Sequence, residues 1–365
     1  MHVGLILKVS KFCNLRCTYC CEMDDLGDRR RMSLNQIETV LCSVRTFLEA
    51  YGSGDDSVSL YWHGGEPLVQ PVSYWSAIRE AQEGCLGEDL CRRTSNALQS
   101  NLTLVKPAHL PLLSWMRIGF SYDVVNDLRV DMKGRPSADQ VVRKVDWLTS
   151  VGVPLAGIVV VSKANATRHE EVADFYLARR LPFRFILLDE ALEHRGEVQV
   201  LRVGLPEYVR FAEALWSLPR VRQAIAGGLR IDPLSEVLSL LKDDDHGSGP
   251  PDTAALGGRE HLLEVDTDGS VYSTADYPYR GSYGSIFEQP LEQLLLSDAR
   301  RRRVARSRDR LDRVCASCRF LGRGCSGARV SHATEPVYAE YVSAGGCELS
   351  LVADVISPPK ASRAA

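Results

Sequence analysis

The stretch Cys13-Asn14-Leu15-Arg16-Cys17-Thr18-Tyr19-Cys20 follows directly after an apolar run at residues 3–9. The spacing C-x3-C-x2-C lets three thiolates ligate three irons of a four-iron cluster from one tight loop. The fourth iron then has no protein ligand and stays open for a small molecule. A structural zinc site, or three unrelated buried cysteines, is the alternative that the spacing alone leaves open. A zinc site would need a fourth ligand, and the adjacent Cys21 is expected to be a packed thiol instead.

Apolar runs and helical patterns alternate through the first two hundred residues. Strands are expected at residues 3–9, 57–62, 94–99, 115–121, 153–161 and 183–188. Helices are expected at residues 34–51, 73–83, 138–151 and 170–180. A helical apolar period is clear in Ile37, Val40, Leu41, Val44, Phe47 and Leu48. The alternation predicts parallel βαβ units in an α/β fold, either a barrel or an open doubly wound sheet. In both, the site lies at the C-terminal ends of the strands.

Further motifs stand at those strand ends. The second strand ends in His63-Gly64-Gly65-Glu66-Pro67, where two glycines permit close backbone approach to a ligand. The third ends in Gln99-Ser100-Asn101, and the fourth leads into a polar segment with Ser121, Asp123, Asn126, Asp127 and Arg129.

These motifs, in this order, resemble the radical S-adenosylmethionine (SAM) superfamily over about the first 190 residues. The resemblance implies a partial (β/α)6 radical SAM barrel in which Cys13, Cys17 and Cys20 hold a [4Fe–4S] cluster. It also implies cofactor binding by the following residues: Tyr19, Gly64, Gly65, Glu66, Pro67, Gln99, Ser100, Asn101, Ser121, Asp123 and Arg129. The match of Arg129 needs a one-residue gap, and Leu102 replaces the usual glycine after Asn101. The cluster would reduce SAM to a 5′-deoxyadenosyl radical.

A second cysteine group comprises Cys315, Cys318, Cys325 and Cys347. Four cysteines can saturate a cluster or a zinc ion. The group resembles the small α+β SPASM domain of peptide-modifying radical enzymes, which commonly holds two auxiliary clusters. One auxiliary cluster is expected here, because two ligands of the second auxiliary cluster are missing. Residues 273–275 contain no cysteine, and Arg329 stands where the other cysteine ligand is expected. The total is then two [4Fe–4S] clusters. Asp276 resembles the base of sulfatase-maturating enzymes, although a hairpin-end aspartate bound to backbone amides is the plainer reading.

The expected organisation is a barrel at 1–200, a helical bridge and loop at 201–255, a SPASM-like domain at 256–352 and a disordered tail at 353–365. A hairpin is expected at 262–265 and 270–272, followed by a helix at 291–306. A cluster of seven arginines is expected to form a solvated helix end or, alternatively, a docking surface for an acidic peptide. They are Arg300, Arg301, Arg302, Arg303, Arg306, Arg308 and Arg310.

Composition limits the partners and location of the 365-residue chain. The net charge of about −3 gives no overall positive potential that would attract nucleic acid. No apolar run approaches the ~20 residues that a membrane-spanning helix needs. The N-terminus lacks the features of a signal peptide, so a cytoplasmic location with reduced thiols is expected. Cys42, Cys85 and Cys91 are assigned to the core or surface.

The resemblance to a cyclophane-forming subset of SPASM peptide maturases implies a reaction. That subset matches at His63, Asn126-Asp127, Gly134-Arg135-Pro136-Ser137 and the segment from Val265 to Asp276. The substrate is then a ribosomally made precursor peptide, and flavodoxin or ferredoxin the electron donor. Since the first strand is expected from Val3, the peptide would bind the barrel, the SPASM region or another protein. Alternatives are sulfatase maturation, aminocyclitol dehydrogenation or a non-enzymatic metal-binding regulator.

Overall fold

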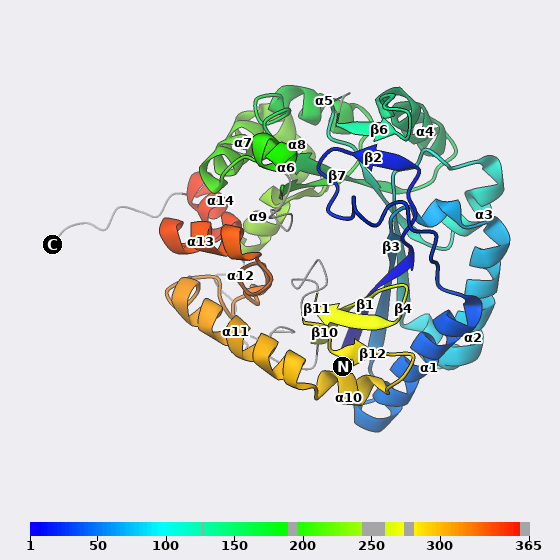
Figure 1. Ribbon diagram of the computed structural model, residues 1–365. Coiled ribbons are helices and arrows are strands. Elements are labelled where there is room, and N and C mark those ends of the chain that lie inside the picture. Colours follow the sequence, from blue (N-terminus) through cyan, green and yellow to red (C-terminus); the bar gives the residue numbers. More distant parts are fainter. Residues whose placement is uncertain (126–127, 189–195, 243–259, 274–280, 358–365) are drawn as a thin grey trace. The chain divides into compact units, whose positions relative to one another are not determined.

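The computed structural model describes residues 1–125, 128–188, 196–242, 260–273 and 281–357 (Figure 1). Two compact units divide the chain. The first comprises residues 1–122, 126–155 and 253–308, and the second residues 123–125, 156–252 and 309–365. Each unit combines segments that are distant in the sequence. The division therefore crosses the domain boundaries expected at residues 200, 255 and 352.

The first unit is built on a mixed sheet with the strand order β12-β11-β10-β1-β3-β4-β5. The strands are β1 (His2–Ser10), β3 (Ser57–Gly64), β4 (Thr94–Ser100), β5 (Arg117–Ser121), β10 (Glu260–Val265), β11 (Ser270–Ser273) and β12 (Gly284–Ser285). From β10 through β1, β3 and β4 to β5 the pairing is parallel. The hairpin β10–β11, expected in a separate C-terminal domain, instead extends this sheet beside β1.

Helices and a short two-stranded ribbon complete the first unit. They are α1 (Leu34–Tyr51), α2 (Val72–Arg92), α3 (Leu110–Leu113), α4 (Ala138–Ser150), α10 (Leu291–Leu295), and the antiparallel pair β2 (Leu15–Cys17) and β6 (Arg129–Asp131). A capping box starts α1, in which Ser33 Oγ accepts from Gln36 N and Gln36 Oε1 from Ser33 N. Short 3₁₀ turns lie at Pro67–Val69 and Pro107–His109.

The second unit has the parallel strands β7 (Leu155–Val161), β8 (Phe183–Leu187) and β9 (Ile231–Asp232). Its helices are α5 (His169–Ala178), α6 (Gly196–Leu201), α7 (Leu205–Ser217), α8 (Pro219–Ala226), α9 (Leu234–Lys242), α12 (Ala328–Ser331), α13 (Glu335–Ala344) and α14 (Glu348–Ile356). Its core includes Phe185, whose ring contacts Tyr208 and Phe211. The division between the two units falls within the long helix α11 (Asp298–Val314), after residue 308.

All six strands expected in the first two hundred residues are present, and this confirms the α/β fold class. The buried face of α1 consists of the same six apolar residues that the periodicity selected. Two expectations are corrected: the helix expected at 291–306 is two helices, α10 and α11, and α14 continues to Ile356, inside the range expected for a tail. Of the described helices, none is long and apolar enough to cross a membrane.

Candidate functional site

The three cysteines of the first motif lie on the loop that follows β1. Cys13 is buried with Leu15 and Leu26, and Cys17 and Cys20 pack against this small cluster. The loop is held by its backbone, because Cys13 N–H donates to Leu26 O at 3.3 Å and Cys20 N–H to Cys17 O at 2.9 Å. The sequence therefore gathers the three expected ligands in one place. Cys21 was expected to be a packed thiol, but it is exposed.

Hydrogen-bond donors lie beside the sulfur atoms of Cys13 and Cys17. Cys13 Sγ accepts from Leu15 N–H at 3.4 Å and from Asn101 Nδ2 at 3.8 Å. Cys17 Sγ accepts from the Arg129 guanidinium at 3.9 Å. Burial and the nearby charge of Glu66 raise the pKa of the Cys13 thiol to about 12. The thiolate form therefore needs a bound cation, and the donors around it suit an iron–sulfur cluster.

The Gly-Gly turn after β3 packs directly on the chain that enters the cysteine loop. A Cβ on Gly64, whose φ is +132°, would lie 2.2 Å from Ser10 O. A Cβ on Gly65 would lie 2.4 Å from Lys11 O and 2.6 Å from Phe12 O. Glu66 N–H donates to Phe12 O at 3.0 Å. Glycine is needed at both positions because no side chain fits between these two segments.

The side chain of Glu66 joins the turn after β3 to the end of β4. Its carboxylate is 1% exposed and accepts from Leu68 N–H at 2.9 Å, Ser100 Oγ at 2.8 Å and Asn101 N–H at 2.8 Å. Asn101 in turn donates to Asn14 Oδ1 at 3.1 Å. Burial raises the pKa of Glu66, and these hydrogen bonds oppose the rise. The two motifs predicted separately at strand ends therefore form one network with the cysteine loop.

The other candidates of the first unit also lie in pairs. Gln99 Nε2 donates to Ser121 Oγ at 2.8 Å, and the Arg129 guanidinium lies 5.2 Å from the centre of the Tyr19 ring. Pro67 is buried and starts the 3₁₀ turn after Glu66.

Asp123 belongs to the second unit, where its carboxylate accepts from Val160 N–H at 2.8 Å and supports β7. Asn126, Asp127 and Asp276 lie outside the described residues.

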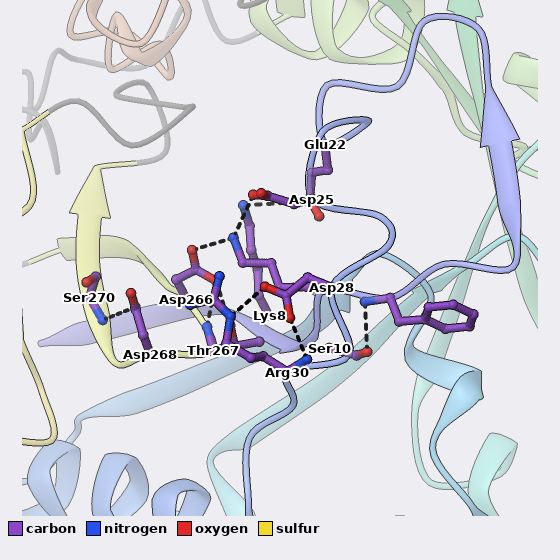
Figure 2. A network of polar contacts seen from close by, with 12 residues as sticks. Lys8, Ser10, Glu22, Asp25, Asp28, Arg30, Asp266, Thr267, Asp268 and Ser270 are labelled. Atoms are coloured by element: carbon purple, nitrogen blue, oxygen red, sulfur yellow. Dashed lines mark hydrogen bonds and ion pairs between the residues drawn. The ribbon is translucent and has the colours of Figure 1, made fainter.

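Two buried lysines, which the sequence analysis did not single out, bind the segment after the cysteines to the hairpin. Figure 2 labels Lys8 together with Glu22, Asp25 and Asp266. Lys8 Nζ lies 2.9 Å from Glu22 Oε1 and 2.6 Å from Glu264 Oε1. Lys11 Nζ lies 3.1 Å from Asp25 Oδ2 and 2.7 Å from Asp266 Oδ2. Both lysines are almost fully buried. The one available sequence signal was Lys8, a charged residue near the end of the apolar run at residues 3–9.

The second cysteine group lies within the second unit. A cavity of about 300 Å³ is lined by Cys315, Cys318 and Cys347, the last of which is the N-terminal cap of α14. Burial raises the pKa of Cys315 to about 12, and the charges of Cys347, Cys318 and Cys325 add to the rise. Three of the four cysteines therefore line one cavity. Such a set suits a cluster ligated by four cysteines.

Arg329, which stands where another cysteine was expected, is held by two carboxylates. Its guanidinium donates to Glu348 Oε1 at 2.7 Å and to Glu236 Oε2 at 2.6 Å. Tyr341 Oη also donates to Glu348. The two carboxylates raise the pKa of Arg329 against the effect of burial, so the guanidinium stays charged.

Comparison with known families agrees with this geometry. Residues 7–176 match the radical SAM superfamily, and this range contains the cysteine loop, the Gly-Gly turn and the Glu66 network. Residues 7–176 of this chain are therefore similar to radical SAM enzymes.

Curated relatives of this chain include anaerobic sulfatase-maturating enzymes. The chain is 26% identical to the serine-type anaerobic sulfatase-maturating enzyme of Klebsiella aerogenes over 60% of its own length, but the match spans only about half (54%) of that relative. It is 24% identical to the cysteine-type anaerobic sulfatase-maturating enzyme of Clostridium perfringens (strain 13 / Type A) over 87% of its length and 86% of the relative.

Solved structures share the fold. Native anSMEcpe with bound AdoMet and Cp18Cys peptide superposes with a TM-score of 0.73, 21% identity, and coverage of 98% of this chain and 100% of that chain. Streptococcus suis SuiB bound to S-adenosylmethionine superposes with a TM-score of 0.58 and 16% identity over 91% of this chain and 75% of that chain. The matched family implies a [4Fe–4S] cluster and SAM, and Cys13, Cys17 and Cys20 pack together on one loop within the matched residues.

Proposed function

We propose that this radical SAM enzyme oxidises a ribosomally made peptide by joining a side-chain β-carbon to an aromatic ring. The observation that carries the peptide assignment is the likeness to anSMEcpe, whose structure holds a peptide and which matches 98% of this chain. SuiB, whose structure is also known with its precursor peptide SuiA, gives similar support. The crosslink itself rests on the resemblance of sequence motifs such as His63-Gly64-Gly65-Glu66-Pro67 to cyclophane-forming enzymes.

The residues of the chain have separate roles in this proposal. Cys13, Cys17 and Cys20 hold the cluster, which with bound SAM supplies a 5′-deoxyadenosyl radical. The Gly64-Gly65 turn, which packs against the loop backbone, offers its remaining backbone groups to the methionine part of SAM. Tyr19, Gln99, Ser121, Asp123 and Arg129 remain proposed cofactor contacts.

The reaction removes two hydrogens from the peptide. One leaves the β-carbon as a hydrogen atom, and the carbon radical then adds to the ring. One electron and one proton must follow to restore aromaticity. Cys315, Cys318, Cys325 and Cys347 would hold an auxiliary [4Fe–4S] cluster, which would supply an electron acceptor, and Asp276 would accept the proton as base. The enzyme then carries two clusters, and a flavodoxin or ferredoxin supplies the electron that starts the reaction.

The count of one auxiliary cluster is supported by Arg329. A guanidinium cannot ligate iron, and this one already pairs with Glu348 and Glu236. A second cluster with a ligand at this position would have to break both ion pairs. This feature favours an enzyme that differs from SPASM proteins with two auxiliary clusters.

Sulfatase maturation is the second candidate, because both curated relatives named above are sulfatase-maturating enzymes. Both reactions remove two hydrogens from a polypeptide. They differ in the product, since one forms a ring and the other an aldehyde that reacts with carbonyl reagents.

Mass spectrometry separates the candidates. The anaerobically reconstituted enzyme is incubated with SAM, dithionite and the short peptide encoded beside its gene, or with a sulfatase-derived peptide. A loss of two hydrogens with a fragmentation-resistant ring supports the crosslink, whereas a product trapped by a hydrazide supports formylglycine. The variant with Cys13, Cys17 and Cys20 all changed to alanine is the control. If the wild type forms no more 5′-deoxyadenosine than this control, radical SAM chemistry is wrong for this chain.

A further inference from the structure

Two cysteines outside both cluster groups face each other across α1 and α2. Cys42 lies on α1 and is exposed, and Cys85 lies on α2 and is partly exposed. The sequence offered no reason to pair them, because they are 43 positions apart (85 minus 42). The two helices pack side by side in the first unit (Figure 1).

Contacts on both sides of Cys42 place Cys85 against its helix face. Cys85 Sγ donates to Glu38 O at 3.7 Å, and the Arg45 guanidinium donates to Cys85 O at 3.3 Å. Glu38, Cys42 and Arg45 follow one another at helical spacings of four and three residues, so they share one face of α1. Cys42 is the middle member of that face. Burial and a hydrogen bond with the Cys42 thiol raise the pKa of Cys85 to about 12.

The backbone beside Cys85 can adjust to a covalent link. The helix α2 is interrupted at Gly87, which has φ 73° and ψ 167°. A cavity of about 500 Å³ lies there, lined among others by Arg45, Leu86 and Gly87. A disulfide requires Cα atoms about 4.4–6.8 Å apart, and a helix break with open space beside it is where small shifts toward that geometry cost least.

We propose that Cys42 and Cys85 are a modification site that forms a reversible disulfide by exchange with a low-molecular-weight disulfide. The exposed Cys42 thiolate attacks the small disulfide, binds one of its halves and releases the other as a thiol. The Cys85 sulfur then attacks Cys42, and the second half leaves as a thiol. The two protein thiols lose two hydrogens, and the small disulfide gains them. No cluster ligand takes part.

The link would close a loop of the chain that contains the SAM-site turn. Residues 42–85 include β3 and the Gly64-Gly65 turn, which contacts the backbone before Cys13. A crosslink between the ends of this segment restricts its unfolded states and ties α1 to α2. We therefore expect the oxidised protein to have a higher thermal midpoint than the reduced protein. The proposal does not depend on which peptide the enzyme modifies.

The test uses the holoenzyme under anaerobic conditions with oxidised glutathione as the probe. After thiol alkylation and trypsin digestion, the expected product is a linked pair of peptides, residues 32–45 and residues 80–92, two hydrogens lighter than their sum. Because Cys91 lies in the second peptide, the experiment is run on the wild type and on Cys91→Ser. The link must survive in Cys91→Ser and disappear in Cys42→Ser.

Three results would overturn the proposal. Glutathione could remain on Cys42 without a link, both thiols could alkylate as fully after oxidation as before, or the link could join Cys42 to Cys91. The wild-type digest alone distinguishes these results by fragmentation between Cys85 and Cys91, so the outcome does not depend on how well a variant folds. Iron content before and after treatment confirms that cluster cysteines are not the source of the signal.

Discussion

The carboxylate of Glu66 accepts a hydrogen bond at 2.8 Å from the backbone N–H of Asn101, so the turn after β3 is tied to the residue that follows β4. Asn101 also donates to Cys13 Sγ and to Asn14. Glu66 therefore influences the cysteine loop through a neighbour as well as through its own backbone contact with Phe12. The two strand-end motifs and the cluster loop act as one unit, and the first two of the following predictions depend on it.

Changing Glu66 to glutamine removes an acceptor that fixed backbone donors require. Leu68 N–H and Asn101 N–H point at different oxygens, so one of them would face the amide NH₂ of glutamine. We expect a loss of about 1–3 kcal/mol in the free energy of unfolding, since a buried donor is left without a partner. Urea unfolding measures it. Glu83→Gln on the exposed face of α2 is the matched control and should change little. Equal stability of Glu66→Gln and wild type would contradict the network.

A methyl group at Gly65 would collide with the backbone of the cysteine loop. The added Cβ would lie 2.4 Å from Lys11 O, and backbone atoms cannot move aside as a flexible side chain could. We expect Gly65→Ala to lose SAM binding and cluster iron, measured by calorimetry and iron assay. Gly84→Ala is the control, because nothing lies within 4 Å of its Cβ and it sits inside α2. That variant should gain about 0.5–1 kcal/mol of stability.

Removing the charge of Lys8 leaves two buried carboxylates without their cation. Glu22 and Glu264 both pair with Lys8 and are almost fully buried. Lys8→Met should lower the free energy of unfolding by about 3–5 kcal/mol, as the breaking of a buried ion pair does. The exposed Lys133→Met should leave it unchanged. Adding Glu22→Gln and Glu264→Gln to Lys8→Met should restore part of the loss. Without such recovery, the ion pairs would not explain the effect of Lys8.

Local patterns predicted much of this fold because they are decided by neighbouring residues. Ser33 and Gln36 start α1, and its apolar period selects the buried face. The pairing of β10 with β1 could not be predicted in this way, since it joins strands from opposite ends of the chain. The arginines of α11 show the same limit. They were expected on a solvated helix end, yet Arg303 and Arg310 are buried, where they donate to Ser273 and Ala333.

The candidate site shows a similar contrast. The cysteine spacing predicted that Cys13, Cys17 and Cys20 would lie together, and the loop bears this out. Asp123 was expected in the same cofactor site from its place after the fourth strand. Its carboxylate also accepts from Val160 N–H in the second unit, a partner that a sequence position cannot reveal. Tertiary contacts decide which polar residue at a strand end serves the backbone.

His109 makes the stability of the first unit depend on pH. Burial lowers its pKa below the usual 6.5, and the charges of Lys106 and Lys144 add to this. The unfolded chain therefore binds a proton more readily than the folded chain, so stability is full above pH 6.5 and falls as the pH drops below it. Thermal midpoints between pH 8 and pH 5 measure the effect. His109→Gln should flatten this part of the profile, and an unchanged slope would show that other groups cause it.

Removing ligands of the second cysteine group should separate the two clusters. Because two clusters of the same type carry equal iron, Cys315→Ala combined with Cys318→Ala should lose about half of the iron. The variant should keep SAM cleavage to 5′-deoxyadenosine, since the loop of Cys13, Cys17 and Cys20 is unchanged. Cys91→Ala, whose sulfur accepts from Gln82 Nε2 at 3.6 Å, should keep all of its iron. Unchanged iron in the double variant would mean that these cysteines hold no cluster. A loss of only about one third, from a wild type with three clusters, would contradict our reading of Arg329.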